Sequence, residues 1–232
     1  MHTQRTIGLI LGGCLVAAVG ALAGFVLWLG PAAGLIAAVA LATAVAAVYV
    51  FVIGPWQRQW GAGAEIARAP MPGDDLLRPD APVTTRAIEI DAPPERVFPW
   101  LRQIGLGRGG WYSYDWIDND GQPSVEHLDP GLWLQVGDRI DMLPGTGPVV
   151  VDLEPDHHIV SAEPTGSWCL LVEPVGAGRS RLISRWKQDW PHSLATSIWI
   201  AVVDPGAFIM ERKMLLRIRE LAERTPATAA VD

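Results

Sequence analysis

The sequence predicts an α+β protein: an antiparallel β-sheet closed by a long C-terminal helix, with a pair of apolar helices in front of it. First, residues 6–57 contain no Asp, Glu, Lys, Arg or His. Second, short runs rich in β-branched residues alternate with turn signals between residues 83 and 187, which is typical of antiparallel strands. Third, apolar residues recur at helical spacing from residue 206 to residue 224.

The composition describes two different objects joined in one chain. The 232 residues are 50% hydrophobic and only 19% charged, and the apolar excess is confined to the N-terminal quarter. The net charge is −7 and no basic run occurs, so nucleic acid is not expected as a partner, because phosphate binding needs a basic face. The two cysteines, Cys14 and Cys169, cannot form a disulfide framework.

Residues 1–57 are expected to form a transmembrane helical hairpin. Segments 6–29 and 33–53 each have about the 20 apolar residues that a spanning helix needs, and Gly30-Pro31 between them is a turn signal. Some small residues recur at a spacing that lets helices approach closely in lipid, although an Ala- and Gly-rich composition explains them equally well. They are Gly13, Ala17, Ala21, Gly20 and Gly24.

The flanking charges predict the orientation of this hairpin. Arg5 precedes the first span, whereas Arg58 and Arg68 follow the second, and the connecting turn is uncharged. The positive-inside rule therefore places both termini and the globular domain on the cytoplasmic side of the plasma (inner) membrane. A cleaved signal peptide is disfavoured because the apolar sequence continues past any cleavage site, and the apolar run before LGGC at 11–14 is too short for a lipoprotein signal.

The rest of the chain divides into a connector, a globular domain and a tail. Residues 58–82 are rich in Gly, Pro and Asp without periodicity, which predicts an extended linker. Residues 83–225 form the domain, and residues 226–232 are expected to be a disordered tail.

The domain begins with a strand at 83–90 and a helix after it. Asp91 is placed to cap this helix, Pro93 and Pro94 suit its first turn, and apolar residues at 97, 100, 101 and 104 give it one buried face. Glycines from 105 to 110 end the helix, and residues 111–119 form a short aromatic helix or turn.

An antiparallel meander is expected next, with strands at 139–142, 149–154, 158–162, 168–173 and 179–187. In the last of these strands, Leu182, Ser184 and Trp186 share a sheltered face, and the other face is expected to be largely wet. Residues 193–203 are too short to span a bilayer, and their β-branched content favours a final strand over a segment lying on the membrane.

The chain ends in an amphipathic helix that Asp204 is expected to cap, with Pro205 in its first turn. Its apolar arc contains Met210, Met214 and Ile218, and Glu211 is the single charged residue inside that arc.

Four segments resemble the START/SRPBCC superfamily, and in particular bacterial proteins of the polyketide cyclase/dehydrase-like type. They are IEIDAPPERVFPWL at 88–101, RGGWYSYDWIDN at 108–119, RSRLISRW at 179–186 and FIMERKMLLRIRELAE at 208–223. The resemblance covers roughly residues 73–224 and excludes the apolar hairpin. It implies a helix-grip fold, in which a curved antiparallel sheet wraps around the C-terminal helix and encloses an apolar cavity. Members of that superfamily bind lipids, sterols or polyketides, a minority catalyse cyclisation or dehydration, and no catalytic signature is common to all of them.

Aromatic and apolar residues from three segments are the ligand-binding candidates, because rings with polar tips suit an apolar ligand with a few oxygens. For the aromatic segment, packing in the core is the stronger alternative. The candidates are Trp111, Tyr112, Tyr114, Asp115, Trp116, Leu182, Ser184, Trp186, Met210, Met214 and Ile218.

Glu211 is the catalytic candidate, because an apolar pocket would raise its pKa and suit it to general acid–base chemistry. The favoured alternative is an ion pair, with Arg108 or Arg185 as the partner, or a solvated carboxylate. No cofactor and no metal are expected. His157 and His158 would point to opposite faces of a strand, His127 and Asp129 lie in a loop, and GLGRGG at 105–110 follows a helix rather than the strand that a dinucleotide fingerprint requires.

Three functions follow from these features. The first is a membrane-anchored binding domain for an apolar small molecule, lipid or polyketide-like, whose partners are the bilayer and that ligand. The second is a cyclase- or dehydratase-like lyase or isomerase that uses the same cavity. The third is a docking or regulatory module of a membrane complex. Binding without catalysis is favoured over the enzyme.

Overall fold

The computed structural model describes residues 2–190 and 193–226, and the chain divides into two compact units, Met1–Trp56 and Gln57–Asp232. From residue 227 on, the expected tail lies outside the described residues.

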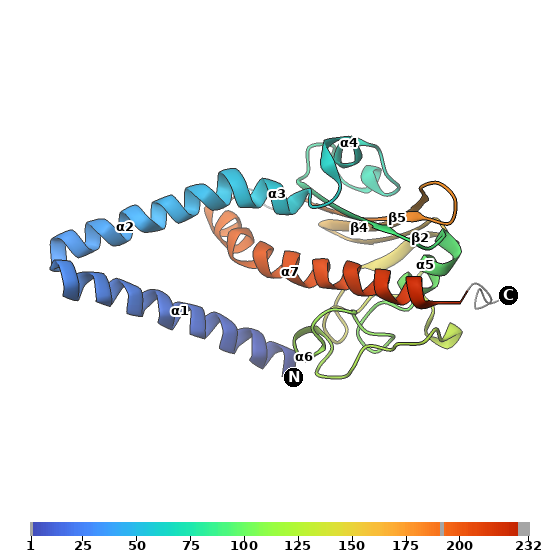
Figure 1. Cartoon of the computed structure of the whole chain (residues 1–232), viewed down its shortest axis with the longest axis horizontal. Helices are drawn as coiled ribbons and strands as arrows, with labels where there is room; N and C mark the ends of the chain where they lie inside the picture. Colours follow the sequence, from blue (N-terminus) through green and yellow to red (C-terminus); the bar gives the residue numbers. More distant parts are fainter. Residues whose placement is uncertain (1, 191–192, 227–232) are drawn as a thin grey trace. The chain divides into compact units, whose positions relative to one another are not determined.

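The first unit is a helical hairpin made by α1 (His2–Leu29) and α2 (Pro31–Val48) (Figure 1). Gly30 makes the turn with a φ of 80°, a conformation that costs glycine little, and Pro31 occupies the first position of α2. The helical path continues through the π-helix η1 (Tyr49–Ile53) into α3 (Gly54–Arg58).

The close contact of this hairpin lies at Gly34. A Cβ atom there would come within 2.6 Å of the Phe25 carbonyl oxygen, whereas a Cβ atom at Gly20 or Gly24 would meet no atom within 4 Å. The small-residue pattern of the first span therefore does not mark the helix contact, which a glycine near the turn provides.

One helix among the described residues, Pro31–Arg58, is long and apolar enough to cross a membrane, and Val16–Leu29 is a shorter apolar helix. Length and composition carry this finding, so the two-span anchor stays a prediction.

The second unit is built on a five-stranded antiparallel sheet with the order β1-β5-β4-β3-β2. The four later strands form the expected meander, and β1 closes it by pairing with β5. The strands are β1 (Val83–Ile90), β2 (Val149–Glu154), β3 (His158–Glu163), β4 (Gly166–Pro174) and β5 (Ser180–Gln188).

The strand expected at 139–142 is wrong. Arg139 makes only an isolated bridge to Val149, and Leu143 already bridges to Thr146 in a tight turn. The turn closes so soon after residue 139 that no ladder of strand length can form, and Pro148 has no N–H to extend one.

The helices of this unit differ from expectation at their ends. Pro93 rather than Asp91 stands at the N-cap of α5 (Pro94–Leu101), and Asp91 instead accepts a hydrogen bond from Arg179 Nε at 2.8 Å. Two short helical turns follow, α6 (Asp115–Asp118) and the 3-10 helix η3 (Pro130–Leu132).

The strand expected at 193–203 is also wrong, because these residues belong to α7 (Leu194–Arg224). Ser193 caps this helix by accepting a hydrogen bond from Thr196 N at 3.0 Å, and Asp204 and Pro205 lie inside the helix rather than at its start. The N-cap at Ser193 stabilises a helix here, and the segment continues directly into a strongly periodic helix. These two effects outweigh the β propensity of its residues, because β propensity depends strongly on context.

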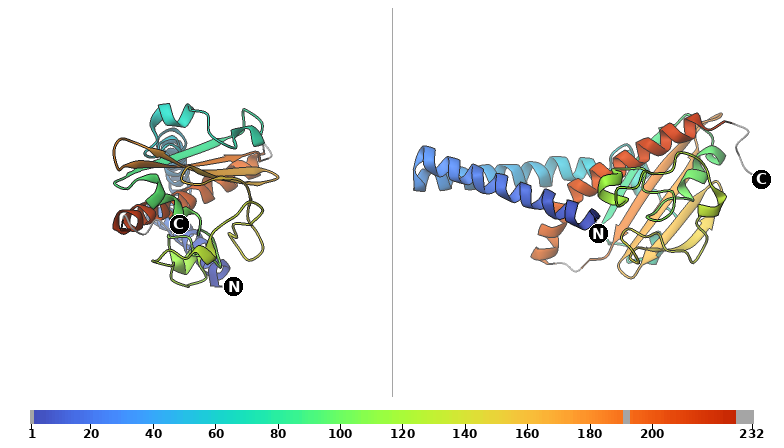
Figure 2. Two further views of the ribbon diagram at one scale, coloured as in Figure 1. Left: turned by 90° about the vertical axis from the view of Figure 1, so that its right-hand side faces the viewer. Right: turned by 90° about the horizontal axis from the view of Figure 1, so that it is seen from below.

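The two faces of the sheet are covered by different parts of the chain, with α7 on one face and α4 (Gly63–Arg68) on the other (Figures 1 and 2). The segment 58–82, expected as an extended linker, carries α4 and the 3-10 helix η2 (Asp74–Leu76). Its Ala62 and Met71 pack with Ala87, Leu171 and Ile183 of the sheet. The face of β5 expected to be wet is therefore buried.

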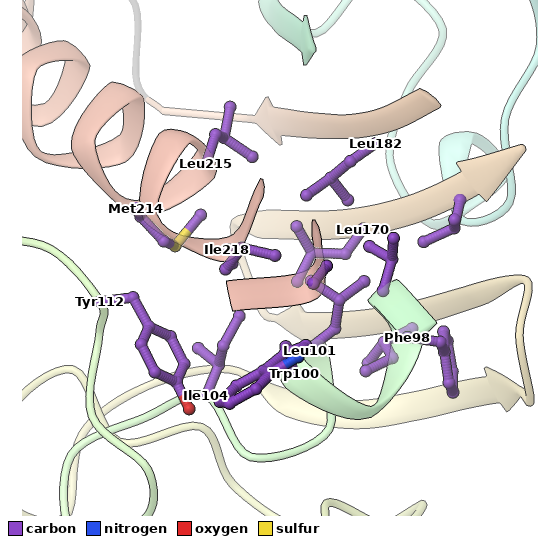
Figure 3. Close-up of a cluster of buried hydrophobic side chains, with 14 of the residues drawn as sticks. Phe98, Trp100, Leu101, Ile104, Tyr112, Leu170, Leu182, Met214, Leu215 and Ile218 are labelled. Atoms are coloured by element: carbon purple, nitrogen blue, oxygen red, sulfur yellow. The ribbon is translucent and has the colours of Figure 1, made fainter. Parts of the chain in front are cut away.

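The larger core fills the space between the sheet, α5 and α7 (Figure 3). Leu170 and Leu182 of the sheet meet Leu215 and Ile218 of α7 there, all almost fully buried. The arrangement is α+β, with one antiparallel sheet and a C-terminal helix across it, and it is consistent with a helix-grip fold.

Candidate functional site

A cavity of about 420 Å³ lies between α7 and the inner face of the sheet. It lies at the end of the sheet where β1 begins and β5 ends, and the middle of α7, from Val203 to Met214, forms its other wall. Its lining is Thr84, Arg86, Trp111, Ser113, Asp118, Met142, Glu163, Trp168, Trp186, Gln188, Trp190, Val203, Asp204, Ala207, Met210, Glu211 and Met214.

Three tryptophans form an aromatic wall of this cavity. Trp168 and Trp186 are paired across β4 and β5, and their rings stack with centroids 4.7 Å apart and planes at 8°. Trp111 lies 6.0 Å from Trp168 at 27°. The buried Trp168 Nε1 donates a hydrogen bond to Ser184 Oγ at 2.8 Å. This bond fixes the orientation of the indole ring and gives its N–H group a partner.

A buried charge cluster stands beside the aromatic wall. Arg86 of β1 donates through Nη1 to Glu211 Oε2 of α7 and through Nε to the Gln57 carbonyl at 2.9 Å. Its Nη2 lies 3.7 Å from Asp204 Oδ1. Asp204 also accepts a 2.7 Å hydrogen bond from Gln57 Nε2 and lies 3.5 Å from Arg58 Nε. Two arginines thus face two carboxylates, and the cluster ties β1 to α7.

Glu211 keeps an incomplete set of partners inside this cluster. Burial raises the pKa of Glu211, and the attraction of Arg86 opposes that rise in part. The Oε1 atom is buried without a hydrogen bond that meets normal geometry, although the Ser184 hydroxyl lies near the carboxyl group and also lowers its pKa. A ligand that donates a hydrogen bond to this buried oxygen would therefore bind more tightly than one that does not.

Asp118 of α6 is a second buried carboxyl group on the cavity wall. Burial raises the pKa of Asp118 to about 6, and a hydrogen bond from the Ser113 side chain opposes that rise in part. The Oδ1 atom of Asp118 makes no hydrogen bond of normal geometry with the described residues. Two carboxyl groups with raised pKa values, each with one incompletely hydrogen-bonded oxygen, therefore line one apolar cavity.

Five of the residues proposed from the sequence line the cavity: Trp111, Trp186, Met210, Glu211 and Met214. The other seven do not. Leu182, Ser184 and Ile218 are fully buried in the core or against Trp168. Tyr114 is the N-cap of α6, and Asp115 and Trp116 lie in its first turn. Asp115 accepts hydrogen bonds from Ser124, and Trp116 is 55% exposed.

Tyr112 is the clearest case of packing rather than recognition. Its hydroxyl accepts a 2.6 Å hydrogen bond from Gln103 Nε2, and its ring meets Trp100 edge-on at 6.0 Å (Figure 3). Burial raises the pKa of Tyr112 to about 12. The packing alternative is the right one for this residue.

The ion-pair partners suggested for Glu211 are wrong. Arg108 donates to the Leu132 carbonyl at 2.8 Å and pairs with Asp138, and Arg185 lies on the opposite face of the sheet. The actual partner, Arg86, was missed, although a signal for it exists. Strand alternation places Arg86 on the same face as Ile88 and Ile90, so it is a charge on an apolar face, as Glu211 is.

Asp118 and Trp168 were also missed as cavity residues. Trp168 could have been found from its alignment with Trp186 in an antiparallel meander. Asp118 carries no sequence signal, because acidic residues are common in the first turn of a short helix.

The argument that His157 and His158 point apart is wrong. His157 lies in the turn after Asp156, which has a φ of 59°, so strand alternation does not apply to it. The two Nδ1 atoms lie 2.8 Å apart.

The fold and cavity define an α+β domain that could enclose a small molecule between a sheet and a helix.

No protein-family model and no curated protein matches the chain. Among solved structures, a Polyketide_cyc-like protein from Corynebacterium glutamicum shares 19% identity over 63% of this chain and 94% of its own, with a TM-score of 0.32. An AHSA1-like protein from Rhizobium etli shares 16% identity over 62% of this chain and 84% of its own, with a TM-score of 0.37. A protein from Mesorhizobium loti shares 16% identity over 61% of this chain and 98% of its own, with a TM-score of 0.35. Sequence identities and TM-scores this low assign no function to this chain.

Proposed function

We propose that this chain is a START/SRPBCC-like, membrane-anchored protein that binds an apolar small molecule in the cavity between its sheet and α7. The observation that carries the proposal is the cavity lining: a tryptophan wall beside two buried carboxyl groups, each with one oxygen that makes no hydrogen bond of normal geometry within the described part of the chain.

The lining defines the chemistry of the ligand. Stacked tryptophan rings and methionines favour an apolar body, and small-molecule sites combine such walls with few, well-placed polar groups. A buried polar atom without a partner costs about 1–3 kcal/mol, which a ligand hydroxyl or amine could offset. A lipid or polyketide-like compound with one or two donor groups meets both conditions.

The apolar hairpin supports a location at the bilayer. The predicted anchor would hold the cavity near the phase in which apolar ligands dissolve, with the second unit on the cytoplasmic side.

Native mass spectrometry of the full chain, released from detergent after incubation with a membrane lipid extract, tests the proposal. We expect one apolar molecule per chain. Ala207→Trp, which fills the cavity from α7, should abolish the bound mass, whereas Ile209→Trp on the same helix should keep it, because Ile209 is 52% exposed and does not line the cavity. A wild-type chain that stays empty, or equal occupancy in both variants, would overturn the proposal.

Catalysis in the same cavity is the second candidate, and the raised pKa values of Asp118 and Glu211 favour it. A buried carboxyl group with a raised pKa can both donate and accept protons, as a cyclase- or dehydratase-like reaction requires. The bound compound should then change mass or retention time on the wild-type chain, and Glu211→Gln should stop that change while keeping occupancy. An unchanged compound would leave binding as the function.

A further inference from the structure

A second cluster of polar side chains lies far from the cavity, at the turn between β2 and β3. It contains Glu154, His157 and His158, with Asp152 behind them. Glu154 and His158 are direct cross-strand partners, and Asp152 pairs with Val160. Since Val160 packs in the cluster beneath residues 58–82, His158 and Asp152 share the sheet face opposite the cavity.

We propose that Glu154, His157 and His158 bind a divalent transition-metal ion of the Zn²⁺ type. Nothing in the cavity proposal depends on this site, and the site does not depend on the cavity.

The separations of the three ligand atoms match a common metal centre. His157 Nδ1 lies 2.8 Å from His158 Nδ1 and 3.2 Å from Glu154 Oε2, and His158 Nδ1 lies 3.7 Å from the same oxygen. Two ligands at about 2.0–2.1 Å from a tetrahedral Zn²⁺ ion are about 3.3 Å apart, and the three distances bracket that value.

A hydrogen bond from behind orients the most buried ligand. His158 Nε2 lies 2.9 Å from Asp152 Oδ2. An ionised carboxylate only accepts hydrogen bonds, so a neutral His158 carries its proton on Nε2 and presents the Nδ1 lone pair toward the other two ligands. Metal-binding histidines show the same support from a carboxylate.

The backbone of the turn also holds the site in place. His157 N donates to the Glu154 carbonyl at 3.2 Å, and the His157 carbonyl accepts from Val172 N at 2.7 Å. The side chains of His157 and Glu154 are 44% and 64% exposed, so an ion can enter from solvent and water can complete its coordination.

The donor set selects the class of ion. Two imidazole nitrogens and one carboxylate oxygen suit Zn²⁺ and its transition-metal neighbours, whereas Mg²⁺ and Ca²⁺ prefer oxygen ligands alone. Without an ion the same groups can form a chain in which His157 Nδ1–H donates to His158 Nδ1. Binding requires His157 to carry its proton on Nε2 instead, and the competition between these two arrangements is what the experiment decides.

The test is a Zn²⁺ titration of the full, untagged chain in mild detergent, after removal of metal with EDTA and in competition with a chromophoric chelator. We expect one Zn²⁺ per chain and a higher melting temperature with Zn²⁺. His157→Gln and His158→Gln should each abolish stoichiometric binding. Asp152→Asn, which touches no ion, should weaken it about 10–100-fold. Co²⁺ in place of Zn²⁺ should give visible absorption that the histidine variants lack.

Two controls separate this site from other binding. His127→Gln changes an exposed loop histidine and Ala207→Trp fills the cavity, and both should keep wild-type Zn²⁺ affinity. Absence of stoichiometric binding, or equal affinity in wild type and a correctly folded His157→Gln variant, would overturn the proposal.

Discussion

At the scale of single residues, the central feature is a pair of charges that each sit on an apolar face. Arg86 and Glu211 are 125 positions apart in the chain and almost completely shielded from water. Burying either one alone would leave an uncompensated charge in a low dielectric, so each charge offsets the desolvation cost of the other. The second residue-scale feature is Asp118, whose carboxyl group is buried and forms no ion pair with the residues that the structure describes.

The Arg86–Glu211 pair predicts strong coupling between two substitutions. Arg86→Met should lower the free energy of unfolding by about 3–5 kcal/mol, because it leaves the Glu211 carboxyl group buried without its cation. Glu211→Leu should cost less, because Arg86 keeps Asp204 and the Gln57 carbonyl as partners. The double variant should cost much less than the sum, since both charges are gone. Chemical unfolding of the full chain in mild detergent, followed by tryptophan fluorescence, measures the cycle. Additive costs would show that the pair is not a unit.

Asp118 predicts a specific dependence of stability on pH. Its folded-state pKa of about 6 is above the ordinary 3.8, so the fold favours the protonated carboxyl group. The stability from this preference is present below about pH 4 and is lost as the pH rises through about 6, by at most about 3 kcal/mol. Asp118→Asn imitates the protonated form and should lose less stability than wild type between pH 4 and 7. Unfolding midpoints at several pH values would check this, and parallel profiles of wild type and variant would contradict it.

At the scale of elements, the segment 58–82 acts as a cover for the sheet rather than as a spacer. Arg185 of β5, only 4% exposed, holds this cover through Asp74 at 2.7 Å and the carbonyls of Ala69 and Ile66 at 2.8 and 2.9 Å. Lys187 adds a 2.6 Å hydrogen bond to the Asp74 carbonyl. The buried Arg185 thus donates hydrogen bonds to carbonyl groups that regular secondary structure would otherwise pair.

Arg185→Met should therefore destabilise the second unit by about 3–5 kcal/mol, because Asp74 and the carbonyls lose their partner. Arg181→Met is the matched control: it lies on the same face of the same strand, but its pair with Glu89 is partly exposed and should contribute less than about 1 kcal/mol. Limited proteolysis should also cut residues 58–82 faster in Arg185→Met alone. Similar losses for the two variants would show that the cover is not held by Arg185.

At the scale of the whole molecule, the chain combines an apolar hairpin with a cavity-bearing α+β unit. Among the described residues, one helical stretch, Pro31–Arg58, has the length and composition to cross a bilayer, and the second unit has its own hydrophobic core. Each unit is compact by itself, which is the organisation that a membrane-anchored domain requires.

We predict that the full chain stays with the membrane pellet after an alkaline carbonate wash, whereas a chain lacking residues 1–56 is released. Two spans with a short turn place both ends of the hairpin on one side, so reporters at the two termini should both be cytoplasmic. A full chain that remains in solution without detergent, or reporters on opposite sides, would contradict the hairpin anchor.

The sequence alone determined the local elements, because their signals are periodic. Alternation in β1 and β5, the turns between the later strands and the helical spacing after residue 206 all depend on near neighbours in the chain. Half-buried strands and amphipathic helices cannot satisfy their apolar faces separately, so the α+β class followed from the same patterns.

Only the tertiary structure decided which residues meet. Residues 58–82 have no periodicity, so nothing local shows that a buried arginine on a distant strand holds them. Residues 193–203 suit a strand by composition and became helix through a cap and continuity with α7. Glu211 and Arg86 are each recognisable as a charge on an apolar face, but neither local pattern shows that these two side chains, 125 positions apart, meet each other. The cavity and its carboxyl groups exist only where those distant segments come together.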